Sequence, residues 1–267
     1  MSRVDAALRD LRSLDALAAR DTPLARVDAR ALTVTTLAFI VTVVSFDRYA
    51  VAALLPLALY PVALAALGDV PAAALLRKLA VAAPFAVMVG LFNPLLDRAP
   101  MAIGSVDIAA GWVSFTSILV RFALTVSAAL LLVAGTGMNG LAAALRRLGM
   151  PRVFTAQLTF LFRYAFVLGG EATRMATARQ LRGNGRPMRL AEAGPMLGHL
   201  LLRAFARAER IHQAMRARGF DGEVRLLGGR RWQARDTLFV AGWCVWFALV
   251  RTVDVPQWLG WLMTGAT

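Results

Sequence analysis

Apolar runs long enough to cross a lipid bilayer are the feature that most constrains the fold of this chain. A transmembrane helix needs about 20 mostly apolar residues to cross a hydrocarbon core about 30 Å thick. The clearest run covers about residues 112–134 and is interrupted only by Arg121. The sequence therefore predicts an all-α polytopic membrane protein with about five transmembrane helices, the other four runs lying at about residues 32–46, 50–67, 79–96 and 237–253.

The net charge and hydrophobic content of the chain together indicate which class of protein it belongs to. The net charge is +14 and 58% of the residues are hydrophobic, and Lys78 is the only lysine. A nucleic-acid-binding domain would explain the charge but not the hydrophobic content, whereas a membrane protein with basic cytoplasmic segments explains both. We therefore expect membrane lipid, and not nucleic acid, among its partners.

The distribution of arginine predicts how the helices are oriented. Nearly all basic residues precede the first apolar run or lie between the fourth and the fifth. Only Arg48, Arg98 and Arg251 fall in the segments on the opposite side. The positive-inside rule then places the amino terminus and the long basic segment in the cytoplasm of a multi-pass inner-membrane protein.

Four regions follow from the apolar runs. The first is amphipathic, with Leu8, Leu11, Leu14 and Leu17 at helical spacing, and is predicted to lie on the cytoplasmic membrane surface. The next holds transmembrane helices one to four, the third is a cytoplasmic domain of about three helices, and the last holds helix five and a tail. Their bounds are residues 1–31, 32–137, 138–235 and 236–267.

The long basic segment is divided into helices by its glycines and prolines. Gly149 and Pro151 are stop signals for a first helix. A second helix is predicted from Arg152 to about Leu181, and a third from about Arg189 to Arg218. We expect the third to be broken or bent near Gly194–Pro195, since proline removes a backbone donor.

The second and third helices have similar ends. One closes with Leu181-Arg182-Gly183 and the other with Ala217-Arg218-Gly219. A terminal glycine with a preceding arginine is ordinary helix capping. An arginine held at a helix end with a free guanidinium is also well suited to bind a carboxylate on a partner protein.

At these residues the sequence resembles the transmembrane T component of energy-coupling factor (ECF) transporters, whose signature is a pair of Ala-Arg-Gly motifs. Ala217-Arg218-Gly219 matches that motif, and the first copy has Leu181 in place of alanine. The segment Val27-Asp28-Ala29-Arg30 resembles the Leu-Asp-Pro-Arg of the family. The run from Leu200 to Gly222 is most similar to the cobalt/nickel branch, called CbiQ or NikQ.

The resemblance implies a non-enzymatic subunit with no cofactor of its own. It would join two ABC-type ATPases, which hold ATP and Mg²⁺, to a CbiM- or NikM-like membrane subunit that holds Co²⁺ or Ni²⁺; a further small membrane subunit is left open. Arg182 and Arg218 would transmit the ATPase motion, and small residues beside them would allow close approach. These are Gly183, Ala217 and Gly219, while Glu171, Arg179, Glu209 and Met215 would support the helices, the glutamates through packing or local ion pairs.

Other functions are less well supported by the residues. A membrane-embedded enzyme would need paired carboxylates or a nucleophile with a base, and the apolar runs hold almost no ionisable group besides Arg121. Two histidines and Cys244 do not form a recognisable metal-ligand set, and there is no GxxxxGK[ST] phosphate loop. A vitamin-type T component and a basic scaffold that binds anionic lipid remain open, as does the choice between cobalt and nickel.

Overall fold

The computed structural model describes residues 15, 17–96, 100–103, 106–184, 190–222 and 232–252. Each predicted apolar run forms helix, and the second run is divided into shorter elements. The first run forms α2 (Ala29–Ser45), and Asp28 caps its start by accepting a hydrogen bond from the Arg30 N–H at 2.8 Å. The second run is interrupted at Pro56, which cannot donate a backbone hydrogen bond. It forms α3 (Val51–Leu54), the 3₁₀ turn η2 (Leu55–Ala58) and α4 (Leu59–Leu67), and a further 3₁₀ turn, η1 (Leu24–Arg26), precedes α2.

The remaining runs form longer helices than the sequence predicts. Helix α5 (Ala72–Leu96) begins seven residues before its predicted start near residue 79. Helix α6 (Ala110–Arg147) continues beyond residue 134 and is broken at Gly137, whose φ of 64° and ψ of 165° are accessible essentially to glycine alone. The last run forms α9 (Ala234–Thr252).

A short antiparallel hairpin lies between α5 and α6, where the sequence predicts only a loop. Strand β1 (Pro100–Ile103) pairs with β2 (Val106–Ala109), with Ile103 opposite Val106. The local signals for this pairing are the two-residue Gly104-Ser105 connection and the β-branched Ile103, Val106 and Ile108 in strands of only four residues each. Apart from this hairpin, the described residues form an all-helical, polytopic fold, as predicted.

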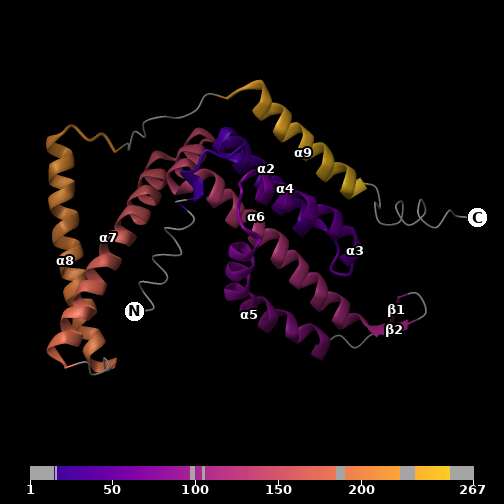
Figure 1. Cartoon of the computed structure of the whole chain (residues 1–267), viewed down its shortest axis with the longest axis horizontal. Coiled ribbons are helices and arrows are strands. Elements are labelled where there is room, and N and C mark those ends of the chain that lie inside the picture. Colours follow the sequence, from indigo (N-terminus) through magenta and orange to yellow (C-terminus); the bar gives the residue numbers. More distant parts are fainter. Residues whose placement is uncertain are drawn as a thin grey trace, which may run out of the picture. The chain divides into compact units, whose positions relative to one another are not determined.

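The chain divides at Gly137 and Arg230 into two compact units. Unit 2 holds residues 16–137 and 230–267, and unit 1 holds residues 1–15 and 138–229. Unit 2 contains α2 to α5, the hairpin, the first part of α6, and α9 (Figure 1). Unit 1 contains the end of α6 together with α7 (Arg152–Arg182) and α8 (Leu190–Ala217).

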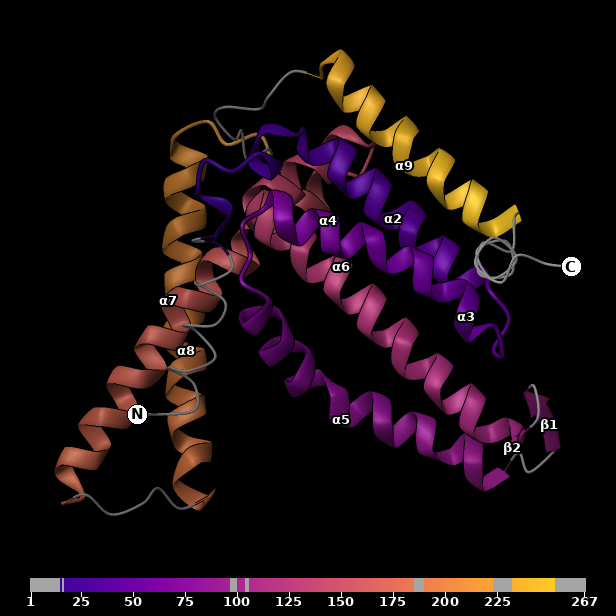
Figure 2. The ribbon, with the colours of Figure 1, turned by 45° about the vertical axis from the view of Figure 1, so that its right-hand side comes forward.

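An aromatic cluster forms the core of unit 2, where α2, α4 and α9 lie side by side (Figure 2). The rings of Phe39 and Tyr60 have centroids 4.7 Å apart, and Phe247 lies 5.5 Å from Phe39. The buried Tyr60 hydroxyl is satisfied by a 2.8 Å hydrogen bond with the Thr36 hydroxyl. This cluster joins residues that are more than 180 positions apart in the chain.

The two ends of unit 2 are fixed by different contacts. At one end, which we call the Leu24 end, a Cβ added to Gly68 or Gly135 would lie 3.0 Å or 2.7 Å from the Leu24 side chain. These glycines therefore allow the end of α4 and the end of the first part of α6 to approach Leu24. At the other end, the Asp47 end, Arg121 of α6 donates a hydrogen bond to the Asp47 carbonyl oxygen.

These contacts give the direction of each helix in unit 2. The Asp28 N–H donates to Asp236 at 3.0 Å at the start of both α2 and α9, and Arg251 donates to the Ser45 carbonyl at 3.4 Å at the end of both. Helices α2 and α9 are therefore parallel, while α4 and α6 run the opposite way. Helix α5 ends where α6 begins, with Asn93 donating to the Ser114 hydroxyl at 2.7 Å, so five passes alternate in direction.

Unit 1 is an antiparallel pair of helices. Glu171 of α7 bonds to Arg203 of α8, and Arg179, further along α7, pairs with Glu192, which is earlier in α8. The predicted break near Gly194–Pro195 is wrong, because α8 continues from Leu190 to Ala217 across both residues. Helix α6 ends at Arg147, and the predicted stop signal Gly149 follows two residues later with a left-handed φ of 101°.

Length and composition identify three helices able to cross a membrane, namely α5, α6 and α7. Helix α2 and the α3–α4 run are apolar but shorter, and α9 carries Arg235, Asp236 and Arg251 within its 19 residues. The cytoplasmic location predicted for α7 from the distribution of arginine differs from this assignment. The predicted surface helix around Leu8 and Leu11 and the tail after Thr252 lie outside the described residues.

Candidate functional site: the helix ends of unit 1

The carboxyl end of α8 is closed by a Schellman motif around the second Arg-Gly pair. The Gly219 N–H donates to the Arg216 carbonyl and the Phe220 N–H to the Met215 carbonyl, both at 3.0 Å. Gly219 has a φ of 76°, which a residue with a side chain adopts only at a cost. Arg218 follows directly on the last helical residue, Ala217, and both are exposed.

The carboxyl end of α7 has a different geometry, although its sequence looks alike. Arg182 is the last helical residue, and Gly183 has a φ of −88°, so the left-handed residue is Asn184, with a φ of 51°. Gly183 is needed for space instead, because an added Cβ would lie 3.2 Å from the Arg179 carbonyl oxygen. The two motifs are thus equivalent in sequence but not in backbone conformation.

This difference predicts unequal effects of the same substitution at the two glycines. Gly219→Ala is expected to destabilise the end of α8 by about 1 kcal/mol, because alanine is strained at positive φ. Gly183→Ala keeps an ordinary φ and requires only a shift of a few tenths of an ångström, so its effect is expected to be smaller. Amide hydrogen exchange at Phe220 should accelerate in the first variant, and equal effects of both variants on their own helix ends would contradict the assignment.

Ion pairs between the buried Glu171 of α7 and two partly exposed arginines of α8 connect the helices. Glu171 is 8% exposed, and its two carboxylate oxygens accept from Arg203 at 3.0 Å and Arg207 at 3.5 Å. The hydrogen bond from Arg203 lowers the pKa of Glu171 below its ordinary value. The glutamate is therefore ionised at neutral pH, and its contribution to stability is lost only as the pH falls through that lowered pKa.

A groove with excess positive charge lies between the two helices, with a volume of about 640 Å³. Arg182 lines it, so the structure brings Arg182 together with Glu171 and Arg179. Its charged lining residues are four arginines and two glutamates, namely Arg174, Arg179, Arg182, Arg203, Glu171 and Glu192. Both glutamates are already paired with arginines, so the groove attracts anions.

Arg182 and Arg218 lie at opposite ends of the helix pair. Because α7 and α8 are antiparallel, Arg182 is next to the start of α8, and Arg218 follows its end. The 28 residues of α8 separate the two arginines by roughly 40 Å. Arg218 thus shares its helix end with Ala217, Gly219 and Met215 and is remote from the groove, and Glu209 is exposed on α8.

Neither motif arginine has a side-chain partner within the part of the chain that the structure describes. Both are exposed, and they end helices whose other arginines, such as Arg179 and Arg203, are bound to carboxylates. Arg203, Arg207 and Glu192, which hold the helix pair together, were not among the predicted site residues. The i, i+4 spacing of Arg203 and Arg207 is a signal for a shared acidic partner, because such residues lie on one helix face.

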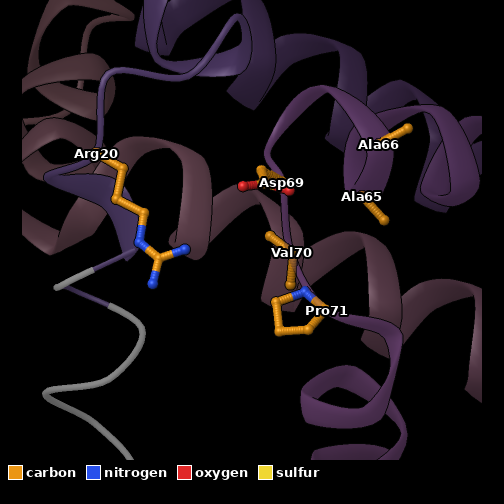
Figure 3. A pocket seen from close by; sticks show the side chains of 6 residues that line it. All are labelled: Arg20, Ala65, Ala66, Asp69, Val70 and Pro71. Atoms are coloured by element: carbon orange, nitrogen blue, oxygen red, sulfur yellow. The ribbon is translucent and has the colours of Figure 1, made fainter.

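A second hollow lies in unit 2 and has no features of a cofactor site. It is lined where α4 turns into α5, has a volume of about 390 Å³, and Arg20 and Asp69 are its charged residues (Figure 3). Among the described residues, no three His, Cys, Asp or Glu side chains lie together as a metal site would require.

Comparison with known proteins shows which family the chain resembles. The family model of the cobalt transport protein CbiQ matches residues 21–226. An uncharacterized protein of Methanocaldococcus jannaschii is 32% identical over 104 residues, which are 38% of this chain and 39% of that protein. The cobalt transport protein CbiQ of Rhodobacter capsulatus is 34% identical over 92 residues, 34% of this chain and 38% of its own length.

The matched stretches span about two fifths of each of these relatives. The family model, in contrast, extends from before α2 to beyond the second Arg-Gly pair, and so covers most of both units. The chain therefore belongs to the CbiQ family of cobalt transport proteins.

Proposed function

We propose that this chain is the transmembrane coupling subunit of an ECF-type ABC importer for cobalt ions in the inner membrane. It transmits motion of two cytoplasmic ATPases to a membrane subunit that binds the metal, and it hydrolyses no ATP itself. The observation that carries this proposal is the pair of exposed arginines, Arg182 and Arg218, at opposite ends of the α7–α8 pair, neither of which has a side-chain partner among the described residues. Membership of the CbiQ family favours cobalt over nickel as the transported ion.

The alternating passes of unit 2 support a location of α7 and α8 outside the membrane. The chain leaves unit 2 just after Gly135 and re-enters it just before Asp236, and both residues lie at the Leu24 end. Residues 138–229 must therefore cross the membrane an even number of times or not at all. Helix α8 carries Arg203, Arg207 and other charges along its length, which disfavours a crossing by α8. If α7 crossed alone, α9 would run antiparallel to α2, whereas the two helices are parallel.

The separation of the two arginines supports two ATPase contacts. Roughly 40 Å between Arg182 and Arg218 is larger than one side chain or one loop can span, so each arginine has its own binding partner. A pair of identical ATPase subunits would offer the same acidic groove twice. The different backbone conformations of the two helix ends do not prevent this, because the free guanidinium, and not the backbone, makes the contact.

Photo-cross-linking in the assembled complex tests the proposal. A photoreactive residue is placed at Leu181 or Ala217, next to each motif arginine, and at Leu238 of α9 as a control of similar exposure. The chain is co-expressed with the ATPases and the metal-binding subunit and irradiated in membranes. Cross-links to an ATPase from positions 181 and 217 but not from 238 are expected, and ATPase cross-links from position 238 alone would contradict the proposal.

A further inference from the structure

Three arginines from distant parts of the chain gather at the Asp47 end of unit 2. The turn after α2 receives a hydrogen bond from Arg121 of α6 on the Asp47 carbonyl oxygen, and one from Arg251 of α9 on the Ser45 carbonyl oxygen. Arg48 belongs to the turn itself, with its guanidinium 4.8 Å from the centre of the Tyr49 ring. We call Arg48, Arg121 and Arg251 the Asp47-end cluster; the helices that carry them are seen in Figure 2.

Capping of α2 explains only part of this arrangement. Carbonyl groups at the end of a helix are partly negative and attract cations. Each guanidinium has five N–H donors, however, and Arg121 and Arg251 each give one to a carbonyl oxygen of this turn. Asp47 is the one carboxylate in the turn, and it accepts a 2.6 Å hydrogen bond from the backbone N–H of Arg48. Three positive charges thus lie beside one negative charge.

Arg121 also carries a buried donor that has no partner among the described residues. Its Nε lies inside unit 2, while its terminal nitrogen reaches the exposed Asp47 carbonyl oxygen. The hydroxyl of Ser117, one turn earlier on the same face of α6, is likewise buried and unpartnered, and Ser117 is 1% exposed. Buried polar groups are nearly always hydrogen-bonded, so this place calls for an acceptor that the described residues do not supply.

We propose that the Asp47-end cluster binds the phosphate group of an anionic membrane phospholipid. Phosphate offers several acceptor oxygens in the geometry that guanidinium forks match, and water held by it can reach Ser117. The cluster lies where α2 ends and α9 ends, at the headgroup level of helices that cross the bilayer, and Tyr49 is of the type enriched there. The inference depends on the membrane location of unit 2 and not on the coupling role of unit 1.

Binding of this lipid has a structural consequence. One headgroup would contact α6, α9 and the turn after α2, which are joined at this end by two hydrogen bonds from arginine to carbonyl groups. It would therefore stabilise unit 2 at the end that is opposite to the buried Asp236 contact.

Native mass spectrometry of the full-length protein tests the proposal. The protein is delipidated in detergent and titrated with dioleoyl phosphatidylglycerol or, in parallel, with dioleoyl phosphatidylcholine. Arg121→Gln/Arg251→Gln is compared with Arg235→Gln, which changes an exposed arginine of the same α9 at the opposite end. Loss of two arginines is expected to weaken retention of phosphatidylglycerol roughly thirtyfold, and Arg235→Gln to leave it unchanged.

Two additional measurements distinguish a lipid phosphate from free phosphate and cover the case in which the double variant does not fold. Inorganic phosphate in millimolar excess should not displace the lipid, and binding of inorganic phosphate with no retention of lipid would overturn the proposal. Equal loss in Arg235→Gln, or no loss in the double variant, would also overturn it. If the double variant does not fold, Arg48→Gln/Arg251→Gln removes two exposed arginines of the cluster, and the same loss of retention is expected.

Discussion

Reversing the charge of Arg182 and Arg218 together is expected to abolish ATP-driven cobalt uptake while the protein remains in the membrane. Each glutamate would face an acidic groove of an ATPase, and like charges at an interface cost several kcal/mol. Since 1.4 kcal/mol corresponds to a tenfold change, uptake should fall at least about a hundredfold. The fold should be kept, because neither side chain has a partner within the described residues. Uptake of radioactive Co²⁺ by vesicles that contain the whole complex measures the effect.

Two variants make this result specific. Arg210→Glu reverses an exposed arginine on α8 that is not at a helix end, and it should leave uptake near the wild-type value. Arg182→Glu alone should reduce uptake less than the double variant, because the second motif remains. A double variant that transports cobalt and still co-purifies with the ATPases would exclude a coupling role for these arginines.

A large loss of stability is expected when Asp236 is replaced. Asp236 is fully buried and joins the starts of α2 and α9. One carboxylate oxygen accepts from the Asp28 N–H at 3.0 Å, and the other from the Gln233 N–H at 2.9 Å. Asp236→Ala removes both hydrogen bonds, and hydrogen bonds to a charged group contribute about 1.5–3 kcal/mol each. Unit 2 should lose about 3–5 kcal/mol of stability, measured as a lower thermal unfolding midpoint of the detergent-solubilised protein.

The controls separate loss of these hydrogen bonds from loss of charge. Asp236→Asn retains one acceptor oxygen but presents an amide donor to the other N–H, so its stability should lie between wild type and alanine. Asp21→Asn changes an aspartate whose side chain is 83% exposed and should have almost no effect. A midpoint for Asp236→Ala equal to that of Asp21→Asn would show that the carboxylate does not join the two helices.

Local patterns in the sequence were sufficient to predict most helices. The apolar run near residues 112–134 lies within α6, and the stop signals Gly149 and Gly219 occur at helix ends with positive φ. Gly183 has the same local sequence but a different conformation, because Asn184 takes the left-handed position. One-dimensional patterns cannot distinguish these two cases, since both glycine and asparagine tolerate that backbone region.

The contacts between distant segments could not be predicted. Asp28 and Asp236 are 208 positions apart, and neither local sequence indicates that the two residues are hydrogen-bonded to each other. Glu171 could be recognised as a packing or ion-pair residue, but its choice of Arg203 and Arg207 among the many arginines depends on the antiparallel register of α7 and α8. The exposed ends of these helices, in contrast, needed no tertiary information.

The chain leaves and re-enters unit 2 at the same end, so residues 138–229 are inserted between two segments of unit 2, as in a protein with an inserted domain. We call unit 2 the host. The host residues on the two sides, 16–137 and 230–267, are held together by their own contacts, including the Asp28–Asp236 and Arg251–Ser45 hydrogen bonds. The insert begins after the glycine at position 137, whose backbone conformation excludes other residues. Segments joined in this way can be exchanged as modules, so the sequence of the inserted helices can diverge while the fold of unit 2 stays the same.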